Sequence, residues 1–191
     1  MTIPAAIWLS LEAKAGAPTA GTITYGVSLF LLLAVSGTYH TPYWSKQTRA
    51  RFQRLDRSMI FVLIAGSYTP FLLAGGETSV SIFLPFIWVV AVLGILRTVF
   101  LPNSSRRLTV VSYVAMGWLS LPLLPGWVDL FGMEVIGLIA AGGLIFTLGA
   151  ITYAKRWPNP WPRTLGYHEI FHVAVLLGSV CHGFAVWMVV A

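Results

Sequence analysis

The stretch Ser79–Leu101 reads SVSIFLPFIWVVAVLGILRTVFL and carries a single charged residue, Arg97. A transmembrane helix needs roughly 20 mostly apolar residues, because the hydrocarbon core is about 30 Å thick and each residue adds about 1.5 Å. This stretch therefore predicts a helix that crosses a membrane. Five further stretches meet the same test: 22–44, 58–75, 108–127, 131–154 and 166–190.

Composition supports the same fold class. Of 191 residues, 57% are hydrophobic and 9% are charged, and the mean hydropathy is +0.80. A water-soluble domain of this length would expose a large apolar surface with such a composition. In lipid the backbone must satisfy its own hydrogen bonds, and the long alternation of a β-barrel is absent from the sequence. We predict an all-α transmembrane bundle that forms a single domain over residues 1–191.

Two details qualify the helices. Residues 1–16 predict only a partial first helix, because the apolar run Ile3–Leu11 is too short to span and Glu12 and Lys14 follow it. Prolines inside the predicted spans should kink their helices, since proline lacks an N–H and clashes with the preceding turn. These prolines are Pro70, Pro85, Pro122 and Pro125.

The basic residues predict the orientation. The net charge of +6 would suit nucleic acid, but the Lys and Arg residues form short clusters between apolar stretches and no stripe with stacking aromatics, which argues against nucleic acid. Eleven of the twelve Lys and Arg residues fall in alternate loops, and the charged residues of the other loops are all acidic. By the positive-inside rule, the basic loops are cytoplasmic and the C-terminus is outside, in the plasma membrane. The basic clusters are Lys46–Arg57, Arg97–Arg107 and Lys155–Arg163.

Ionisable residues inside a membrane are costly and indicate function. His40 closes the first full predicted span, Asp56 opens the second, and His168 and His172 begin the last. The orientation comes from Lys and Arg alone, yet it places all four groups in the cytoplasmic leaflet. The single cysteine, Cys181, excludes an intrachain disulfide and a cysteine-rich metal cluster.

The histidine spacing favours zinc. His168 and His172 are four residues apart, so on a helix they share a face about 6 Å apart along the axis. With His40 they supply three imidazoles and leave a fourth position open for water, which is typical of catalytic zinc. Asp56 is a candidate to orient that water or take its proton, and Ser36 lies one helical turn before His40.

Other interpretations remain open from the residues alone. His40 is compatible with a packing role, and Asp56 with an ion pair to a neighbouring arginine. His168–His172 fits the H-E-x-x-H pattern, in which Glu169 would be the base of a metalloprotease. Two histidines on different helices would also suit a b-type haem. His182 lies about 15 Å further along the last helix, which is too distant for the same ion. We predict that it is a hydrogen-bonded interior residue.

Several segments resemble the hemolysin III family of bacterial membrane proteins, within the progestin and adiponectin receptor (PAQR) superfamily. The resemblance covers residue 19 to the C-terminus and rests on the order of the segments. Residues 1–16 look like the tail of the family's first helix and lack its polar residues. The matching segments are Ser36–His40, Arg54–Asp56, Ile64–Phe71, Gly166–His172 and His182.

The resemblance implies a seven-helix fold with an outer C-terminus. It implies Zn²⁺ on His40, His168 and His172, with Asp56 and Ser36 next to the zinc-bound water. Animal relatives look like ceramide hydrolases and can carry Gln at the position of Glu169, which argues against a protease-type base. We therefore expect a zinc-dependent hydrolase acting on lipid amides or esters, with membrane lipids as partners. The alternatives are a non-catalytic homeostasis, sensor or haemolysin-like protein with structural zinc, and an intramembrane metalloprotease.

Overall fold

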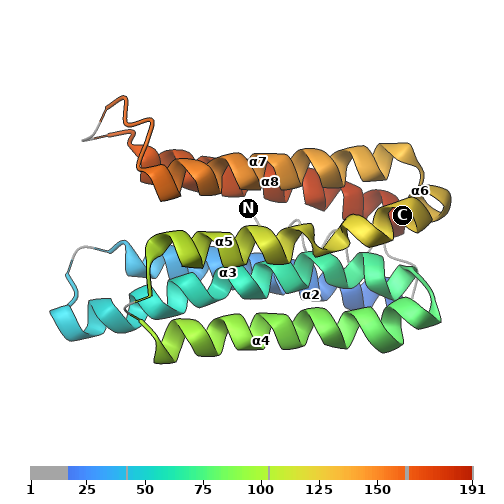
Figure 1. Cartoon of the computed structure of the whole chain (residues 1–191), viewed down its shortest axis with the longest axis horizontal. Helices are drawn as coiled ribbons and strands as arrows, with labels where there is room; N and C mark the ends of the chain where they lie inside the picture. Colours follow the sequence, from blue (N-terminus) through green and yellow to red (C-terminus); the bar gives the residue numbers. More distant parts are fainter. Residues whose placement is uncertain (1–16, 42, 103, 162–163, 191) are drawn as a thin grey trace. The chain divides into compact units, whose positions relative to one another are not determined.

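The fold is described by a computed structural model, which covers residues 17–41, 43–102, 104–161 and 164–190 (Figure 1). Within these residues the chain is nearly all helical, with no β-strand and one isolated bridge between Trp161 and Leu165. Six helical segments are long and apolar enough to cross a membrane. The all-α transmembrane fold with six full spans is therefore confirmed. The partial first helix predicted for residues 1–16 lies outside the described residues.

The chain groups into two compact parts, Met1–Ser104 with Val190–Ala191 and Ser105–Val189. The single domain over residues 1–191 stays a prediction. The first part contains α2 (Ala17–Tyr39), α3 (Lys46–Ala74), the π-helix η1 (Ser79–Phe83) and α4 (Leu84–Phe100). The second contains α5 (Arg106–Gly117), the 3-10 helix η2 (Trp118–Leu123), α6 (Leu124–Phe131), α7 (Met133–Lys155) and α8 (Tyr167–Val190).

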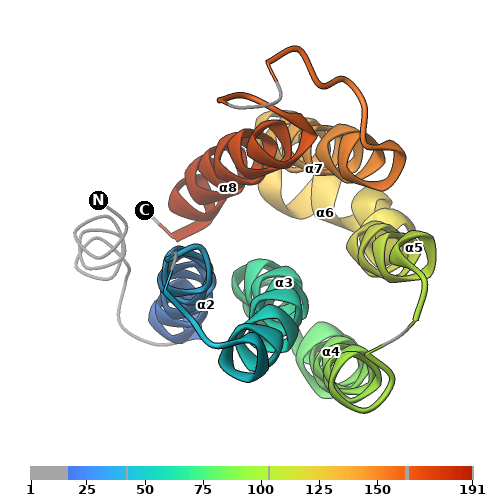
Figure 2. The same ribbon diagram turned by 90° about the vertical axis from the view of Figure 1, so that its left-hand side faces the viewer.

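In the first part, α3 packs between α2 and α4 (Figures 1 and 2). The approach of α2 to α3 depends on Gly66, because the hydroxyl of Ser28 lies where a Cβ at that position would stand. On the other side, the Trp88 indole of α4 donates to the hydroxyl of Thr69, with 3.2 Å between the atoms. Small residues and buried hydroxyls are the usual means by which membrane helices come close.

The helix α3 begins well before the predicted span at residue 58. Ser45 caps it, since its hydroxyl accepts a hydrogen bond from the backbone N–H of Thr48 at 3.2 Å. A hydropathy window misses these first three turns because Lys46–Arg57 is rich in charge. The expectation that Asp56 opens the helix is therefore wrong: Asp56 is the eleventh residue of α3.

The prolines change helix type where they fall. Pro85 follows the π-helical turn at the start of α4, and Pro122 lies in the 3-10 segment η2. Pro125 is the second residue of α6, and the predicted single span 108–127 is broken into α5, η2 and α6. Proline lacks the N–H that the regular ladder needs, which explains these changes. Pro70 is accommodated inside α3.

In the second part, α7 lies between α5 and α8 (Figure 2). Gly149 of α7 faces the side chain of Ala174 on α8, where an added Cβ would come within 2.6 Å of the Ala174 Cβ. The Trp118 indole donates to the hydroxyl of Thr147 on α7 at 3.0 Å. This packing places the start of α8 beside the end of α7.

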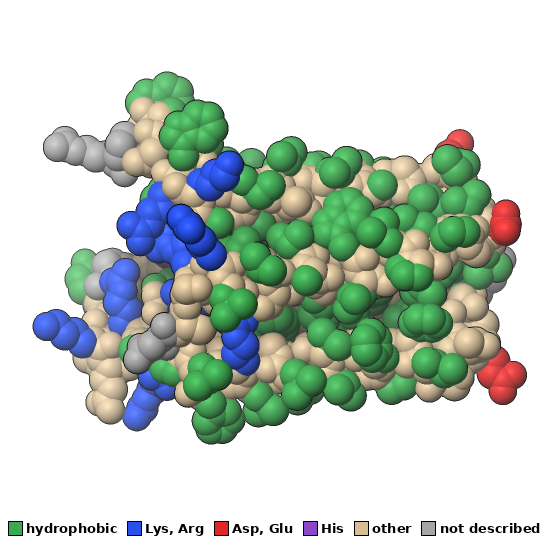
Figure 3. Space-filling model, viewed as in Figure 1, with side chains coloured by type: hydrophobic (Ala, Val, Ile, Leu, Met, Phe, Trp, Pro, Cys, Tyr) green, Lys and Arg blue, Asp and Glu red, His purple; other side chains and the backbone are tan. Residues whose placement is uncertain are grey.

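Each part carries its Lys and Arg side chains at one end of its helices, and acidic side chains gather at the other (Figure 3). Asp56 and Glu169 are the acidic residues at the basic ends of the described segments. In the first part the basic end holds Lys46–Arg57 and Arg97, and Glu77 lies at the opposite end. In the second part, Arg106 and Lys155 lie at helix ends remote from Asp129. The charge pattern favours a spanning orientation, and its cytoplasmic assignment stays a prediction.

Candidate metal centre

The start of α8 is fixed by a capping interaction. The Glu169 carboxylate accepts a hydrogen bond from the backbone N–H of Gly166 at 2.8 Å. Glu169 is the third residue of the helix, so this is the carboxylate half of a capping box. An added Cβ at Gly166 would meet Asn159 Oδ1 at 2.5 Å, so the preceding loop passes close to this turn. The helix therefore begins just before His168.

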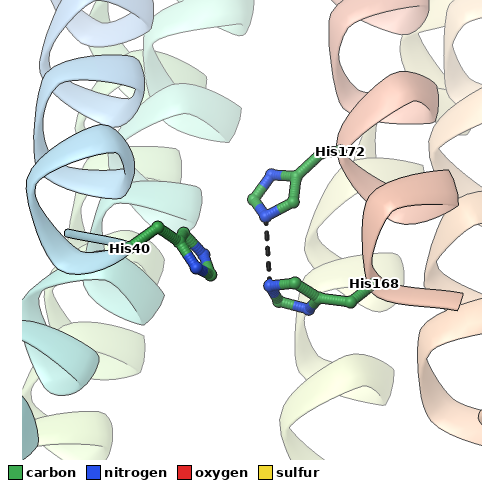
Figure 4. Close-up of side chains that lie close together, drawn as sticks. All are labelled: His40, His168 and His172. Carbon is green, nitrogen blue, oxygen red and sulfur yellow. Dashed lines mark hydrogen bonds between the residues drawn. The ribbon is translucent and has the colours of Figure 1, made fainter. Parts of the chain in front are cut away.

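His168 and His172 lie on one face of α8, as their spacing predicts. Their Nε2 atoms are 3.1 Å apart, their ring centroids are 4.6 Å apart, and the rings are nearly perpendicular (Figure 4). Two nitrogens bound tetrahedrally to one zinc at about 2.0–2.1 Å lie about 3.3 Å from each other. The pair therefore fits two ligands of a single zinc ion.

Aromatic side chains support the pair, and sequence reasoning did not find them. The Tyr153 ring of α7 lies 5.7 Å from the His168 ring and 5.1 Å from the Phe171 ring. The Arg106 guanidinium lies 4.9 Å from the Tyr153 centroid and 5.8 Å from that of Tyr167. Arg106 thus links the start of α5 to the end of α7 and to the start of α8, which bears His168. In the sequence it was only one basic residue among several.

In the first part, His40 directly follows α2, and its side chain is drawn in Figure 4. Its backbone N–H donates to the carbonyl of Ser36 at 3.1 Å, so the residue continues the helical ladder by one bond. The carbonyl of Thr38 accepts from the Trp44 indole at 2.8 Å and from the backbone N–H of Thr41 at 3.2 Å, which satisfies this group at the helix end. The exposed His40 side chain stacks edge-on with Tyr39 at 4.8 Å.

Ser36 and Asp56 share a level in this part. The Gln53 side chain of α3 donates to the Tyr39 hydroxyl of α2 at 3.2 Å, which fixes the register of the two antiparallel helices. Ser36 precedes Tyr39 by three residues and Asp56 follows Gln53 by three, so each lies about 4.5 Å further into the bundle. The buried Ser36 and the half-buried Asp56 are thus one turn deeper than the Tyr39–Gln53 bond.

The structure thus brings His168 and His172 together, and it places Ser36 and Asp56 at the same depth along α2 and α3. The full ligand set with His40 joins the two parts and stays a prediction. The structure also bears on the interpretations of Glu169 and His182. Glu169 has an oxygen bound to the backbone of Gly166, and His182 donates from Nε2 to the carbonyl of Ile139 at 3.2 Å, which confirms it as a hydrogen-bonded interior residue.

These features define a multi-pass helical membrane protein with a histidine pair spaced to share one metal ion. The chain belongs to the haemolysin-III related family, whose model matches residues 1–183. Membership confirms the hemolysin III resemblance in the sequence.

Relatives come from bacteria and animals. The chain is 35% identical to hemolysin-3 of Bacillus cereus, over 97% of this chain and 84% of that protein. It is 27% identical to the human monocyte to macrophage differentiation factor, over 85% of this chain and 67% of the human protein. It is also 27% identical to the adiponectin receptor protein of Drosophila melanogaster, over 82% of this chain and 39% of the receptor. The similarity thus extends to adiponectin receptor relatives.

Proposed function

We propose that this protein is a zinc-dependent hydrolase that cleaves an amide or ester bond of a lipid at the cytoplasmic leaflet of the plasma membrane. The observation that carries the proposal is the 3.1 Å separation of Nε2 in His168 and His172, which suits two ligands of one zinc ion. His40 is the proposed third ligand, because it directly follows α2 at the basic end of its part, and His168 lies in the first turn of α8 at the basic end of the other.

A zinc ion held by these three histidines would lower the pKa of a water molecule to about 7 and would polarise a carbonyl. The Asp56 carboxylate is the proposed base that takes a proton from the attacking water, and the Ser36 hydroxyl is the proposed group that orients it. Water adds to the carbonyl carbon, and the bond to nitrogen or oxygen breaks. The leaving amine or alcohol takes the proton, and a fatty acid is released.

The level shared by Ser36 and Asp56 supports these roles. The depths of both residues follow from one helix register, which the Tyr39–Gln53 hydrogen bond between α2 and α3 sets. A polar pair one turn inside the bundle from the His40 end of α2 is suitably placed to serve a metal-activated water at that end. The position of Glu169 argues against the metalloprotease, because its carboxylate oxygen caps the helix.

Lipid hydrolysis tests the proposal directly. Purified zinc-loaded protein is incubated with a total lipid extract, and released fatty acid is measured by mass spectrometry. The wild type should release fatty acid, and Asp56→Asn should lower the rate by about 10²–10⁴-fold, the usual contribution of a general base. Asp129→Asn changes an exposed acidic residue remote from the basic end of its own part, so it is the matched control and should keep full activity.

The zinc content of the same samples distinguishes a catalytic zinc from a structural zinc. Asp56→Asn should keep the zinc of the wild type, because Asp56 is not a proposed ligand. A wild type that holds zinc yet releases no fatty acid from any lipid class would overturn the enzyme and leave zinc as a structural link. That outcome would suit a haemolysin or a membrane-homeostasis protein, in keeping with the name of the Bacillus cereus relative.

A further inference from the structure

His182 forms a second polar centre in α8, apart from the histidine pair. It follows His172 by ten residues, or about 15 Å along the helix. It belongs to the same compact part as its partners on α7, so its surroundings are defined without reference to the zinc site. The proposed function assigns it no role.

Packing against α7 fixes the orientation of the ring. Gly142 lies against its Cδ2–Nε2 edge, and a Cβ there would overlap this edge. Phe146 meets the ring edge-on, with centroids 5.3 Å apart. On the same edge, Nε2 contacts the carbonyl oxygen of Ile139 at 3.2 Å. The opposite edge, with Nδ1, therefore faces away from Gly142.

The hydrogen bond to Ile139 also fixes the tautomer. A carbonyl oxygen only accepts, so Nε2 must carry the proton. A second proton would place an imidazolium in a membrane span, where charge is strongly disfavoured. Nδ1 is consequently a bare acceptor. The atom is shielded from solvent, and no residue in the described segments donates a hydrogen bond to it.

We infer that Nδ1 of His182 is a binding site for an O–H group inside the membrane, supplied by an internal water or by a hydroxyl-bearing membrane molecule. A buried acceptor with no donor is rare, since bound water or a ligand normally satisfies it. Ser179, also buried, lies one turn earlier on the same face of α8 and offers this O–H group a second polar neighbour. Phospholipids with unsubstituted acyl chains carry no donor at this depth.

Nitrogen NMR of the ring tests this site. Full-length protein with ¹⁵N-labelled histidine is placed in nanodiscs of phosphatidylcholine with unsubstituted acyl chains. The His182→Gln variant, or His182→Asn if Gln misfolds, identifies the ring by the loss of its signals. We expect a protonated Nε2 and an unprotonated Nδ1 whose chemical shift is that of a hydrogen-bonded acceptor.

A second nanodisc separates the two sources. A hydrogen-bonded Nδ1 in the first nanodisc assigns the donor to water, the one O–H source there outside the protein, provided that the signal persists in Ser179→Ala. A shift that changes from bare to hydrogen-bonded only when hydroxystearoyl phosphatidylcholine is included assigns it to a hydroxyl-bearing chain. A bare acceptor in both nanodiscs, or a proton on Nδ1, would overturn the inference. Metal-free protein serves equally well, so a failure of the zinc proposal does not affect this result.

Discussion

The Glu169 carboxylate and the backbone N–H of Gly166 form a hydrogen bond of 2.8 Å at the first turn of α8. Removing the acceptor in Glu169→Ala should lower the free energy of unfolding by about 0.5–2 kcal/mol, the usual effect of losing a helix cap. In Glu169→Gln the side-chain oxygen can still accept this bond, so its stability should stay closer to the wild type. Thermal unfolding of both variants in detergent measures the difference.

The same pair of variants tests the role of Glu169 in chemistry. If the residue is a cap, Glu169→Gln should retain both zinc and lipid hydrolysis. A variant that keeps its zinc and stability but loses all hydrolysis would instead favour a catalytic carboxylate, as in the H-E-x-x-H interpretation.

Arg106 should stabilise the first histidine through its contacts with Tyr153 and Tyr167. The Arg106→Gln variant removes the cation from both rings and should lower the free energy of unfolding by about 0.5–2 kcal/mol. It should also weaken zinc binding, because Tyr153 contacts His168. The control is Arg107→Gln, which removes an equal charge from the exposed neighbouring residue. Titration of both variants with zinc provides the measurement, and equal losses would show that charge alone matters.

Gly142 should tolerate no side chain, since His182 occupies the adjacent space. The Gly142→Ala variant should destabilise the protein by about 1–3 kcal/mol through overpacking. Gly137 on the same helix has no atom within 4 Å of an added Cβ, so Gly137→Ala is the matched control and should be neutral or slightly stabilising. Thermal unfolding compares the two, and an equal response would contradict the packing account.

Much of the fold followed from the sequence, because apolar stretches must be helical in lipid. The pairing of His168 with His172 followed as well, since four residues on a helix return to the same face. The start of α3 did not, because its first three turns are charged and hydropathy detects only the apolar part. The cap at Ser45 was the available signal.

Contacts between residues distant in sequence were beyond prediction. Arg106 meets Tyr153 across 47 positions, and no local pattern distinguishes it from Arg107. The shared depth of Ser36 and Asp56 depends on the Tyr39–Gln53 hydrogen bond, which sets the register of α2 and α3. Such registers follow from side-chain packing, and periodicity within one helix does not specify them.

Zinc content tests the central claim most directly. Purified wild type should hold one zinc ion per chain by elemental mass spectrometry. The single variants His40→Ala, His168→Ala and His172→Ala, compared as folded monodisperse fractions, should lose it, and His182→Gln should retain it as the matched control. A wild type without zinc, or a His172→Ala variant that still holds it, would contradict the proposed site.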